Sequence, residues 1–424
     1  MTSANFITAR EQFMAHHWRR YPSMTMLEHR EDCIFGRVLR RDHTRLVLST
    51  DSGVDLTTVT WMPVTLLHPN AQEMTPPVGE VIAIGDWVAF DQSRNRMALL
   101  APNLLRPSQN DTELSGRAVN WAAFLKRVRD FFWSQQFIEV STPTLAPSPG
   151  TEPFLDPLSV RYEFGSDVQM RYLITSPEFH LKKVLAAGVP KVFEIAKCFR
   201  NKEGGQHHRI EFHMLEWYRA FSDLSLIADD VERLIQVFSP EVKLARVSVR
   251  ELFLRYADFD LTPGTTREEL EAHCKRVGIH TDHTDDFNDL FHRVWLEQIE
   301  GPLETHAQGN PVLVQDYPPA LSALARIGQS GFAERFEVYW RGLELCNAFH
   351  ELNDPRENRM RFERDLAEKR RLGKESVPLD EELLKAFESG MPPSGGIALG
   401  LERLYMAVHD ITDIGQVAAF SAMV

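Results

Sequence analysis

The stretch Phe199–Tyr218, FRNKEGGQHHRIEFHMLEWY, mixes apolar strand-forming residues with charged groups that are costly to bury. Arg200 follows the apolar segment KVFEIAKCF, and Glu216 stands directly before an aromatic pair. Two apolar segments separated by a glycine-containing loop predict a hairpin. Arginine is the side chain best suited to the planar oxygens of carboxylates and phosphates. The stretch therefore predicts a hairpin that carries an anion-binding group and a buried carboxylate.

Three further stretches concentrate residues of the same kind. Residues 175–178, TSPE, lie where a strand gives way to a helix, and residues 395–403, GGIALGLER, form a glycine-rich strand that runs into a helix. Glu337, Glu344 and Glu351 follow one another at intervals of seven residues in an aromatic and apolar segment. An odd separation on one strand puts side chains on opposite faces, so a bulge or bend is needed for the three to converge. Buried carboxylates require a cation, either Mg²⁺ bridging ATP phosphates or a ligand ammonium; surface acids on an edge strand are the alternative.

The pattern of elements predicts two domains and an α+β fold. Residues 32–107 contain five short β-branched or alternating segments divided by turns, which suit a small OB-type barrel; another small barrel or a sandwich is the alternative. We place an OB-like domain at 1–107 and a catalytic domain at 108–424, with a mostly helical insertion at about 222–300. Long helical intervals between strands indicate a large antiparallel sheet rather than a doubly wound one. No P-loop or Rossmann fingerprint occurs, which disfavours those ATP-binding folds.

Composition indicates a soluble protein with an acidic catalytic part. The net charge is −13, and residues 1–107 hold 11 Arg against 11 Asp and Glu, so the remainder carries the excess. Such a body repels tRNA and attracts a basic protein partner. Neither a membrane-spanning segment nor a secretory signal is present, which predicts a cytoplasmic location and no membrane partner. The four cysteines are scattered, as expected for free buried thiols in a reducing compartment.

Three of these segments, taken in order, resemble the motifs of a known family. FIEVSTP resembles motif 1 of the class II aminoacyl-tRNA synthetases, with Pro143 at a dimer interface; FRN…EF…LEWY resembles motif 2, and GIALGLER resembles motif 3. SPEFHLKKV, LEWYRAF and ELCNAFHELND are similar to the lysyl branch. The short C-terminal end after motif 3, the Trp217-Tyr218 pair and Ala398 are similar to truncated paralogues that attach β-lysine to a lysine of elongation factor P. The resemblance covers about residues 108–424 and implies a homodimer that uses ATP and Mg²⁺.

The resemblance also implies a role for individual residues. The carboxylate of the substrate and the α-phosphate would be held by Arg200, and Arg403 would lie near the γ-phosphate; both are predicted to be catalytic. The residues predicted to bind lysine or β-lysine are Ser176, Glu178, Glu216, Tyr218, Asn347, Phe349 and Glu351. Those predicted to bind ATP are Arg200, Asn201, Lys202, His208, Arg209, Phe212, Glu344, Leu345, Gly400 and Arg403. The predicted Mg²⁺ ligands are Glu337 and Glu344.

Motif 2 departs from the family pattern at two nucleotide contacts. Lys202 stands where the family has a glutamate beside adenine, and Arg209 stands where it has an asparagine. Glu203 is adjacent and could take over the first contact. Three hypotheses remain: a ligase that modifies elongation factor P, a lysyl-tRNA synthetase-like enzyme that charges tRNA through the N-terminal domain, and a catalytically degenerate lysine-binding paralogue. The acidic body and Ala398 favour the first.

Overall fold

The computed structural model describes residues 109–417, with side chains for residues 116–417, and the backbone of seven strands nearer the N-terminus. The chain divides into two compact units, whose boundary lies between Leu125 and Lys126 within helix α2. The predicted domain boundary at residues 107–108 stays a prediction. Each unit is described by itself below.

The N-terminal unit contains a seven-stranded sheet. Its strands are β1 (Cys33–Arg41), β2 (Arg45–Thr50), β3 (Leu56–Thr60), β4 (Thr65–Leu67), β5 (Glu73–Met74), β6 (Trp87–Asp91) and β7 (Arg96–Ala101). They pair in the order β3-β2-β1-β6-β7-β4-β5. Closure of this sheet into an OB-type barrel stays a prediction, and the parts of residues 1–108 between these strands lie outside the described residues.

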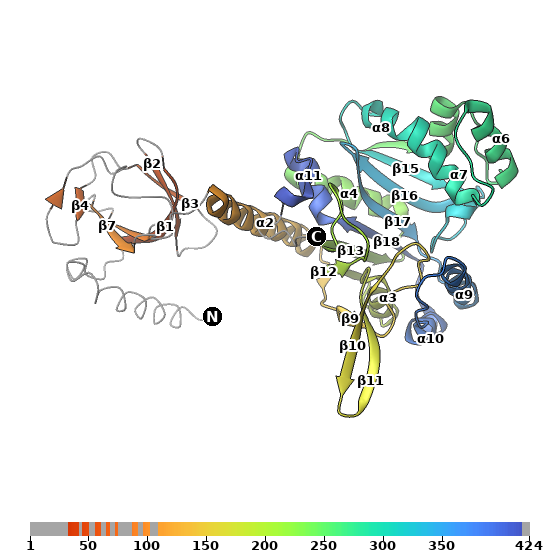
Figure 1. The fold of residues 1–424 in the computed structure, drawn as a ribbon, viewed down its shortest axis with the longest axis horizontal. Helices are drawn as coiled ribbons and strands as arrows, with labels where there is room; N and C mark the ends of the chain where they lie inside the picture. Colours follow the sequence, from red (N-terminus) through yellow and green to blue (C-terminus); the bar gives the residue numbers. More distant parts are fainter. Residues whose placement is uncertain are drawn as a thin grey trace. The chain divides into compact units, whose positions relative to one another are not determined.

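An eight-stranded mixed sheet forms the centre of the second unit (Figure 1). Its order is β14-β15-β16-β17-β18-β13-β12-β8. The strands are β8 (Ile138–Glu139), β12 (Lys191–Phe199), β13 (Glu211–Ala220), β14 (Ala245–Ser248), β15 (Val312–Tyr317), β16 (Ala333–Trp340), β17 (Leu343–His350) and β18 (Ser394–Gly400). The α+β class is confirmed. The prediction of an antiparallel sheet holds for the six central strands and is wrong at both edges, where β8 and β14 pair in parallel with their neighbours.

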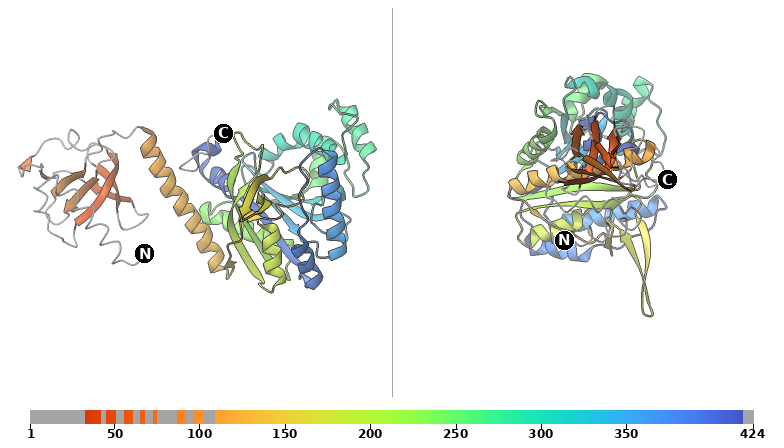
Figure 2. Two further views of the ribbon diagram at one scale, coloured as in Figure 1. Left: turned by 60° about the horizontal axis from the view of Figure 1, so that its bottom comes forward. Right: turned by 90° about the vertical axis from the view of Figure 1, so that its left-hand side faces the viewer.

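Helices and one hairpin surround the sheet. The helices are α2 (Gln109–Ser134), α3 (Glu178–Ala186), α4 (Leu224–Phe238), α5 (Val249–Leu252), α6 (Arg267–Val277), α7 (Phe287–Val294), α8 (Glu300–His306), α9 (Pro355–Arg371), α10 (Glu381–Gly390) and α11 (Leu401–His409). A smaller sheet joins β9 (Leu145–Ala146) to the hairpin of β10 (Leu158–Phe164) and β11 (Asp167–Leu173). The right-hand view of Figure 2 shows this yellow hairpin extending away from the sheet.

The segment predicted as a helical insertion is built around its own apolar core. Helices α5 to α8 gather at the β14–β15 end of the sheet and bury a shared cluster that includes Phe253, Phe291 and Trp295 (Figure 1). Strand β14 lies inside this segment and extends the main sheet beside β15. Residues 222–300 are therefore mostly helical and also contribute an edge strand, and their status as an insertion stays a prediction.

Strand β13 separates an apolar face of the sheet from a polar one. Its side chains alternate, as in any strand. Trp217 points to the face covered by α2 and α4, where Phe132 lies with its ring centroid 5.1 Å from that of Trp217 and 4.8 Å from that of Phe193. Glu216 and Tyr218 point to the opposite face. The aromatic layer fixes this register, because a slip by one residue would exchange the two faces.

A hairpin brings together two of the three glutamates at seven-residue intervals, Glu337 and Glu344, while Glu351 lies with Lys182 and Glu178. Glu337 lies on β16 and Glu344 on β17, joined by a tight turn at Arg341 and Gly342 with φ of 52° and 72°. Two positive φ values in a row are typical of the turn that matches strand twist. The register shifts between Val338 and Tyr339. A bend and a bulge therefore occur in this hairpin, but the expectation that all three glutamates converge is wrong, because Glu351 pairs with Lys182 instead.

A search of the described residues finds no helix that is long and apolar enough to cross a membrane. Cys198, Cys274 and Cys346 are free and buried, as predicted; the Cys33 side chain lies outside the described residues.

A buried ion pair attaches α4 to β13. Asp230 is completely buried and accepts from Arg219 at 2.6 and 2.7 Å and from Arg233 at 2.8 Å. The two arginines differ in exposure, since the Arg219 side chain is 11% exposed and the Arg233 side chain 45%. Removal of the carboxylate therefore leaves a nearly buried charge without its counterion.

We predict that Asp230→Ala lowers the free energy of unfolding by about 3–5 kcal/mol, because Arg219 then has no carboxylate partner. The measurement is urea unfolding followed by circular dichroism. The matched control is Asp229→Ala, which removes an exposed pair with Arg246 and should cost less than about 1 kcal/mol. Equal losses in the two variants would contradict this account.

Candidate active site

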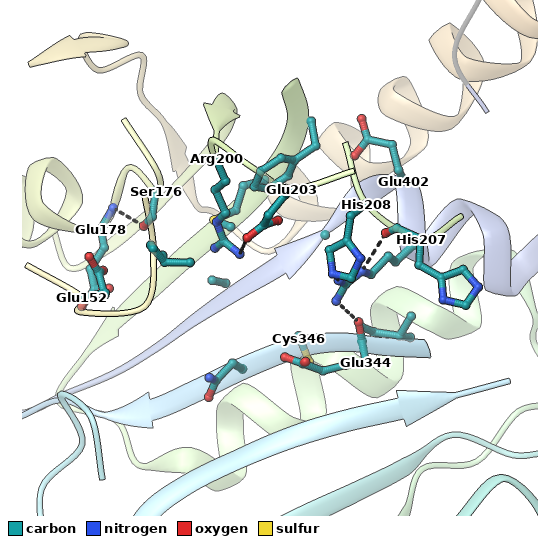
Figure 3. Close-up of a pocket in the computed structure, with 18 of the residues that line it drawn as sticks. Glu152, Ser176, Glu178, Arg200, Glu203, His207, His208, Glu344, Cys346 and Glu402 are labelled. Carbon is teal, nitrogen blue, oxygen red and sulfur yellow. Dashed lines mark hydrogen bonds and ion pairs between the residues drawn. The ribbon is translucent and has the colours of Figure 1, made fainter. Parts of the chain in front are cut away.

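A cavity of about 300 Å³ opens on the polar face of the sheet, over β13, β17 and β18. Figure 3 shows its two ends, with Glu152, Ser176 and Glu178 at one, His207, His208 and Glu344 at the other, and Arg200 between. Most residues predicted for the site line this cavity. They are Ser176, Glu178, Arg200, His208, Arg209, Phe212, Glu344, Leu345, Asn347, Phe349, Gly400 and Arg403.

The remaining predicted residues do not line the cavity. Glu216, Tyr218 and Glu351 are buried and bonded to residues of the cavity end that holds Glu178. Glu337 is a buried residue of β16, and Asn201 and Lys202 are not among the residues that line the cavity. Twelve of the predicted site residues therefore line one cavity and six do not, and the roles of all of them stay predictions.

Lys182 is a buried cation that the sequence interpretation missed. Its Nζ lies 2.5 Å from Oε1 of Glu178 and 2.7 Å from Oε2 of Glu351, and its side chain is 1% exposed. Burial alone would lower the pKa of Lys182, but the two carboxylates raise it above its ordinary value. The ammonium therefore stays charged and joins the helix α3 to the strand end that carries Glu351. The spacing of Glu178 and Lys182, one helical turn, was the available signal.

Glu216 sits behind the cavity wall. It accepts from the hydroxyl of Ser176 at 2.5 Å and from that of Tyr218 at 3.2 Å. The Ser176 oxygen in turn accepts from the backbone N–H of Glu178 at 3.0 Å, where α3 begins after Pro177. Burial and the neighbouring Glu178 raise the pKa of Glu216 well above its usual range. A cation arriving at this end would stabilise the charged form.

Gly396 makes the close approach of two strands possible. A Cβ atom at this position would overlap Oε1 of Glu351 and the ring of Tyr218 at distances that real contacts do not reach. Gly396 pairs with both Tyr218 on β13 and Phe349 on β17. The absence of a side chain here leaves the space in which Glu351 and Tyr218 lie.

Arginines occupy the middle and the other end of the cavity. The guanidinium of Arg200 lies 5.2 Å from the ring centroid of Phe212 and 3.9 Å from Oε1 of Glu203. Arg403 donates to the backbone oxygen of Glu344 at 2.9 Å and to Nε2 of His208 at 2.5 Å. Burial and Arg403 lower the pKa of His208, which keeps its ring neutral. Both guanidinium groups are therefore held for an anionic ligand.

Glu344 is the residue that could hold a metal ion against phosphates. It lines the cavity, and burial together with Glu337 raises its pKa to about 7. Glu337 itself accepts from the hydroxyls of Tyr317 at 2.6 Å and Tyr339 at 2.5 Å and pairs with Arg335. Its oxygens are thus already occupied. Glu344 fits Mg²⁺ as a single carboxylate ligand completed by phosphates, and no cluster of three metal-ligating side chains exists among the described residues.

Asn201 and Lys202 anchor the segment 148–156. The N–H of Asn201 donates to the backbone oxygen of Asp156 at 2.7 Å, and Nζ of Lys202 lies 3.2 Å from Oδ2 of Asp156. The Lys202 side chain is 71% exposed and its φ is 63°. Glu203, the neighbour named as a substitute, does line the cavity. Roles of Asn201 and Lys202 in ATP binding stay predictions.

Further lining residues were not predicted from the sequence. Glu152 lies in an irregular loop that no periodicity reveals, and Glu402 starts α11 next to Arg403. Glu402 accepts from the N–H of His213 at 3.0 Å and lies 2.7 Å from its Nδ1, which ties motif 3 to motif 2. The cavity can thus hold cationic groups at its carboxylate end and anionic groups at its arginine end.

Comparisons with known proteins agree with this geometry. Residues 112–424 match the family of tRNA synthetases class II (D, K and N). The chain is 35% identical over 305 residues to the elongation factor P–(R)-β-lysine ligase of Edwardsiella ictaluri, which covers 71% of this chain and 93% of that protein. The ligase of the same name from Klebsiella pneumoniae is 36% identical over 306 residues, with the same coverage. That of Vibrio vulnificus is 34% identical over 321 residues, 74% of this chain and 97% of that protein.

We predict that Gly396→Ala lowers the free energy of unfolding by about 1–3 kcal/mol, because the added methyl displaces Glu351 and Tyr218. Thermal and urea unfolding measure the change. Gly400→Ala on the same strand is the control, since its methyl would meet Arg403 at 3.7 Å, an ordinary contact, and should change stability by less than about 0.5 kcal/mol. A neutral Gly396→Ala would show that the two strands can relax.

Proposed function

Since the chain belongs to the family of class II tRNA synthetases (D, K and N), we propose that it is an ATP-dependent ligase for lysine or β-lysine. It activates the amino acid as an aminoacyl-adenylate and transfers it to a lysine side chain of elongation factor P. The observation that carries the proposal is the surplus of carboxyl groups at one end of the cavity. Glu152, Glu178, Glu216 and Glu351 gather there, and among the described residues only Lys182 pairs with any of them.

A ligand with more than one ammonium group would neutralise this surplus of carboxyl groups. Buried carboxylates without counterions are costly, and an arriving cation offsets that cost. Lysine and β-lysine each bring two ammonium groups and one carboxylate. The amino group near the carboxylate would meet the Glu178 end, and the distant ammonium would reach Glu351 beside Tyr218, Asn347 and Phe349. The carboxylate would then face Arg200.

The arginine end provides what adenylate formation needs. The carboxylate of the substrate attacks the α-phosphorus of ATP in line and pyrophosphate leaves, a reaction that depends on positioning and charge neutralisation. Arg200 would stabilise the charge on the α-phosphate, and Arg403 would bind the γ-phosphate. Adenine would stack on Phe212, with His208, Arg209, Leu345 and Gly400 around the nucleotide. Mg²⁺, held by Glu344 and the phosphates, would supply further positive charge; Glu337 would act by positioning Glu344.

Two observations support elongation factor P as the acceptor: the names of the relatives and the negative net charge of the chain. The relatives of 34–36% identity described above are elongation factor P–(R)-β-lysine ligases. The acidic body disfavours a phosphate backbone and favours a basic protein surface. The amine of the acceptor lysine would attack the mixed anhydride and release AMP. The alternative acceptor is tRNA. It rests on the proposal that strands β1–β7 of the N-terminal unit form an OB-type barrel.

A homodimer is part of this proposal. In and around the segment that resembles motif 1, residues 137–143, Trp133 and Ile138 are each 52% exposed and Leu145 is 38% exposed. Exposed large apolar side chains so close in the sequence are consistent with a protein contact, which supports this part of the proposal. Pro143 lies between them in the sequence. A second copy of the chain is the partner that the family resemblance implies.

We predict that the protein catalyses ATP–pyrophosphate exchange that depends on lysine or β-lysine, and that Arg200→Gln lowers kcat/KM by about 10²–10³. Loss of the charge opposite the α-phosphate is the reason. Arg161→Gln, on the exposed β10–β11 hairpin, is the control and should leave the exchange unchanged. No exchange with either amino acid would contradict the activation step and favour a degenerate lysine-binding paralogue.

The acceptor is tested separately with labelled β-lysine or lysine, ATP, and either elongation factor P or bulk tRNA. We expect label on elongation factor P, at one lysine located by mass spectrometry. Label on tRNA alone would contradict the proposed acceptor while leaving the activation step intact.

A further inference from the structure

We propose that Glu152 binds the amino group at the reacting end of the substrate, as the carboxylate of the cavity wall that no protein cation neutralises. This inference rests on the proposed function, because it concerns the amino acid that the cavity activates. It adds a residue to the predicted pair Glu178 and Glu216. The other carboxylates at this end already have partners within the protein.

The other carboxylates at this end are already engaged within the protein. Glu178 and Glu351 share the ammonium of Lys182 at 2.5 and 2.7 Å. Glu216 accepts from two hydroxyls and does not reach the cavity. Among the described residues, no basic side chain forms an ion pair with Glu152, although it lines the cavity with Glu178 and Arg200. Glu152 is therefore the carboxylate most available to a ligand ammonium.

The loop holds the Glu152 carboxylate in place. The backbone oxygen of Pro149 accepts from the Thr175 hydroxyl at 2.9 Å, and that of Phe154 accepts from Nζ of Lys374 at 2.7 Å. Gly150 has a φ of 118°, and a Cβ there would overlap the carboxylate of Glu152. The side chain thus folds back over its own loop in a space that only glycine leaves free.

The surroundings of Glu152 hold charges of both signs. Burial and Glu178 raise its pKa to about 7, while a hydrogen bond from its own backbone, Lys369 on α9 and Arg200 after β12 act in the opposite direction. The two cations are near enough to influence the carboxyl group but not to form an ion pair with it. A ligand ammonium between Glu152 and Glu178 would remove their mutual repulsion. Arg200 fixes the carboxylate of the substrate nearby, so the ammonium concerned is the one at the reacting end.

A ligand–mutant cycle tests the assignment. Affinities of wild type and Glu152→Gln are measured by titration calorimetry at pH 8 for lysine, β-lysine and 6-aminohexanoate, which keeps the carboxylate and the distant ammonium but lacks the amino group in question. Of lysine and β-lysine, one will bind wild type more tightly. We expect Glu152→Gln to lower the affinity for that amino acid by at least about tenfold, since a charged hydrogen bond is lost. The variant should bind 6-aminohexanoate within about twofold of wild type. Equal losses for all ligands, or no loss, would overturn the inference.

Two further variants separate charge from structure. Glu152→Asp keeps the charge and should lose less affinity than Glu152→Gln; a larger loss would overturn a role for the charge. Glu388→Gln, an exposed acid on α10, is the matched control and should leave binding unchanged. The melting temperature of Glu152→Gln at pH 8 should equal or exceed that of wild type, because a carboxyl group whose pKa is raised by folding opposes folding once it is ionised. Wild type that binds none of the three ligands would refute the proposed function itself.

Discussion

The buried chain Glu178–Lys182–Glu351 is the interaction on which the site depends. It joins the first turn of α3 to the end of β17 and carries two carboxylates for one ammonium. Each ion alone would be costly to bury, and the geometry keeps all of them only because the ions compensate one another. The arrangement leaves negative charge in excess. We propose that this excess makes the cavity end specific for a cationic ligand rather than merely polar.

The two faces of β13 show how a sequence pattern becomes a site. Alternation places Trp217 against Phe132 and Phe193 on the covered face, and the same alternation forces Glu216 and Tyr218 toward the cavity. The helix after Pro177 and the glycine-rich strand before Arg403 could likewise be predicted, because caps, turns and glycines act over a few residues. These local rules were enough to locate most of the lining.

Long-range contacts account for what the sequence did not reveal. Glu152 is positioned by a loop whose backbone oxygens accept hydrogen bonds from Thr175 and Lys374, which are distant in the chain. No periodic pattern in the sequence therefore reveals it. The same is true of the edge strand β14, whose parallel partner lies some sixty residues further on, as its pairing of Ala245 with Val312 shows. Lys202 could be recognised as a departure, but only the fold shows it pairing with Asp156 outside the cavity. Lys202 therefore makes a supporting contact outside the cavity, and its role in ATP binding stays a prediction.

The central claim is that uncompensated carboxylates select an amino acid with two ammonium groups. The most direct measurement is the shift in melting temperature produced by lysine, β-lysine and norleucine over a concentration series without ATP. Norleucine has the same carbon chain as lysine but lacks the distant ammonium. The account predicts a saturable rise with lysine or β-lysine and none with norleucine at the same concentrations. An equal rise with norleucine would show that the cavity recognises shape alone and would contradict the account.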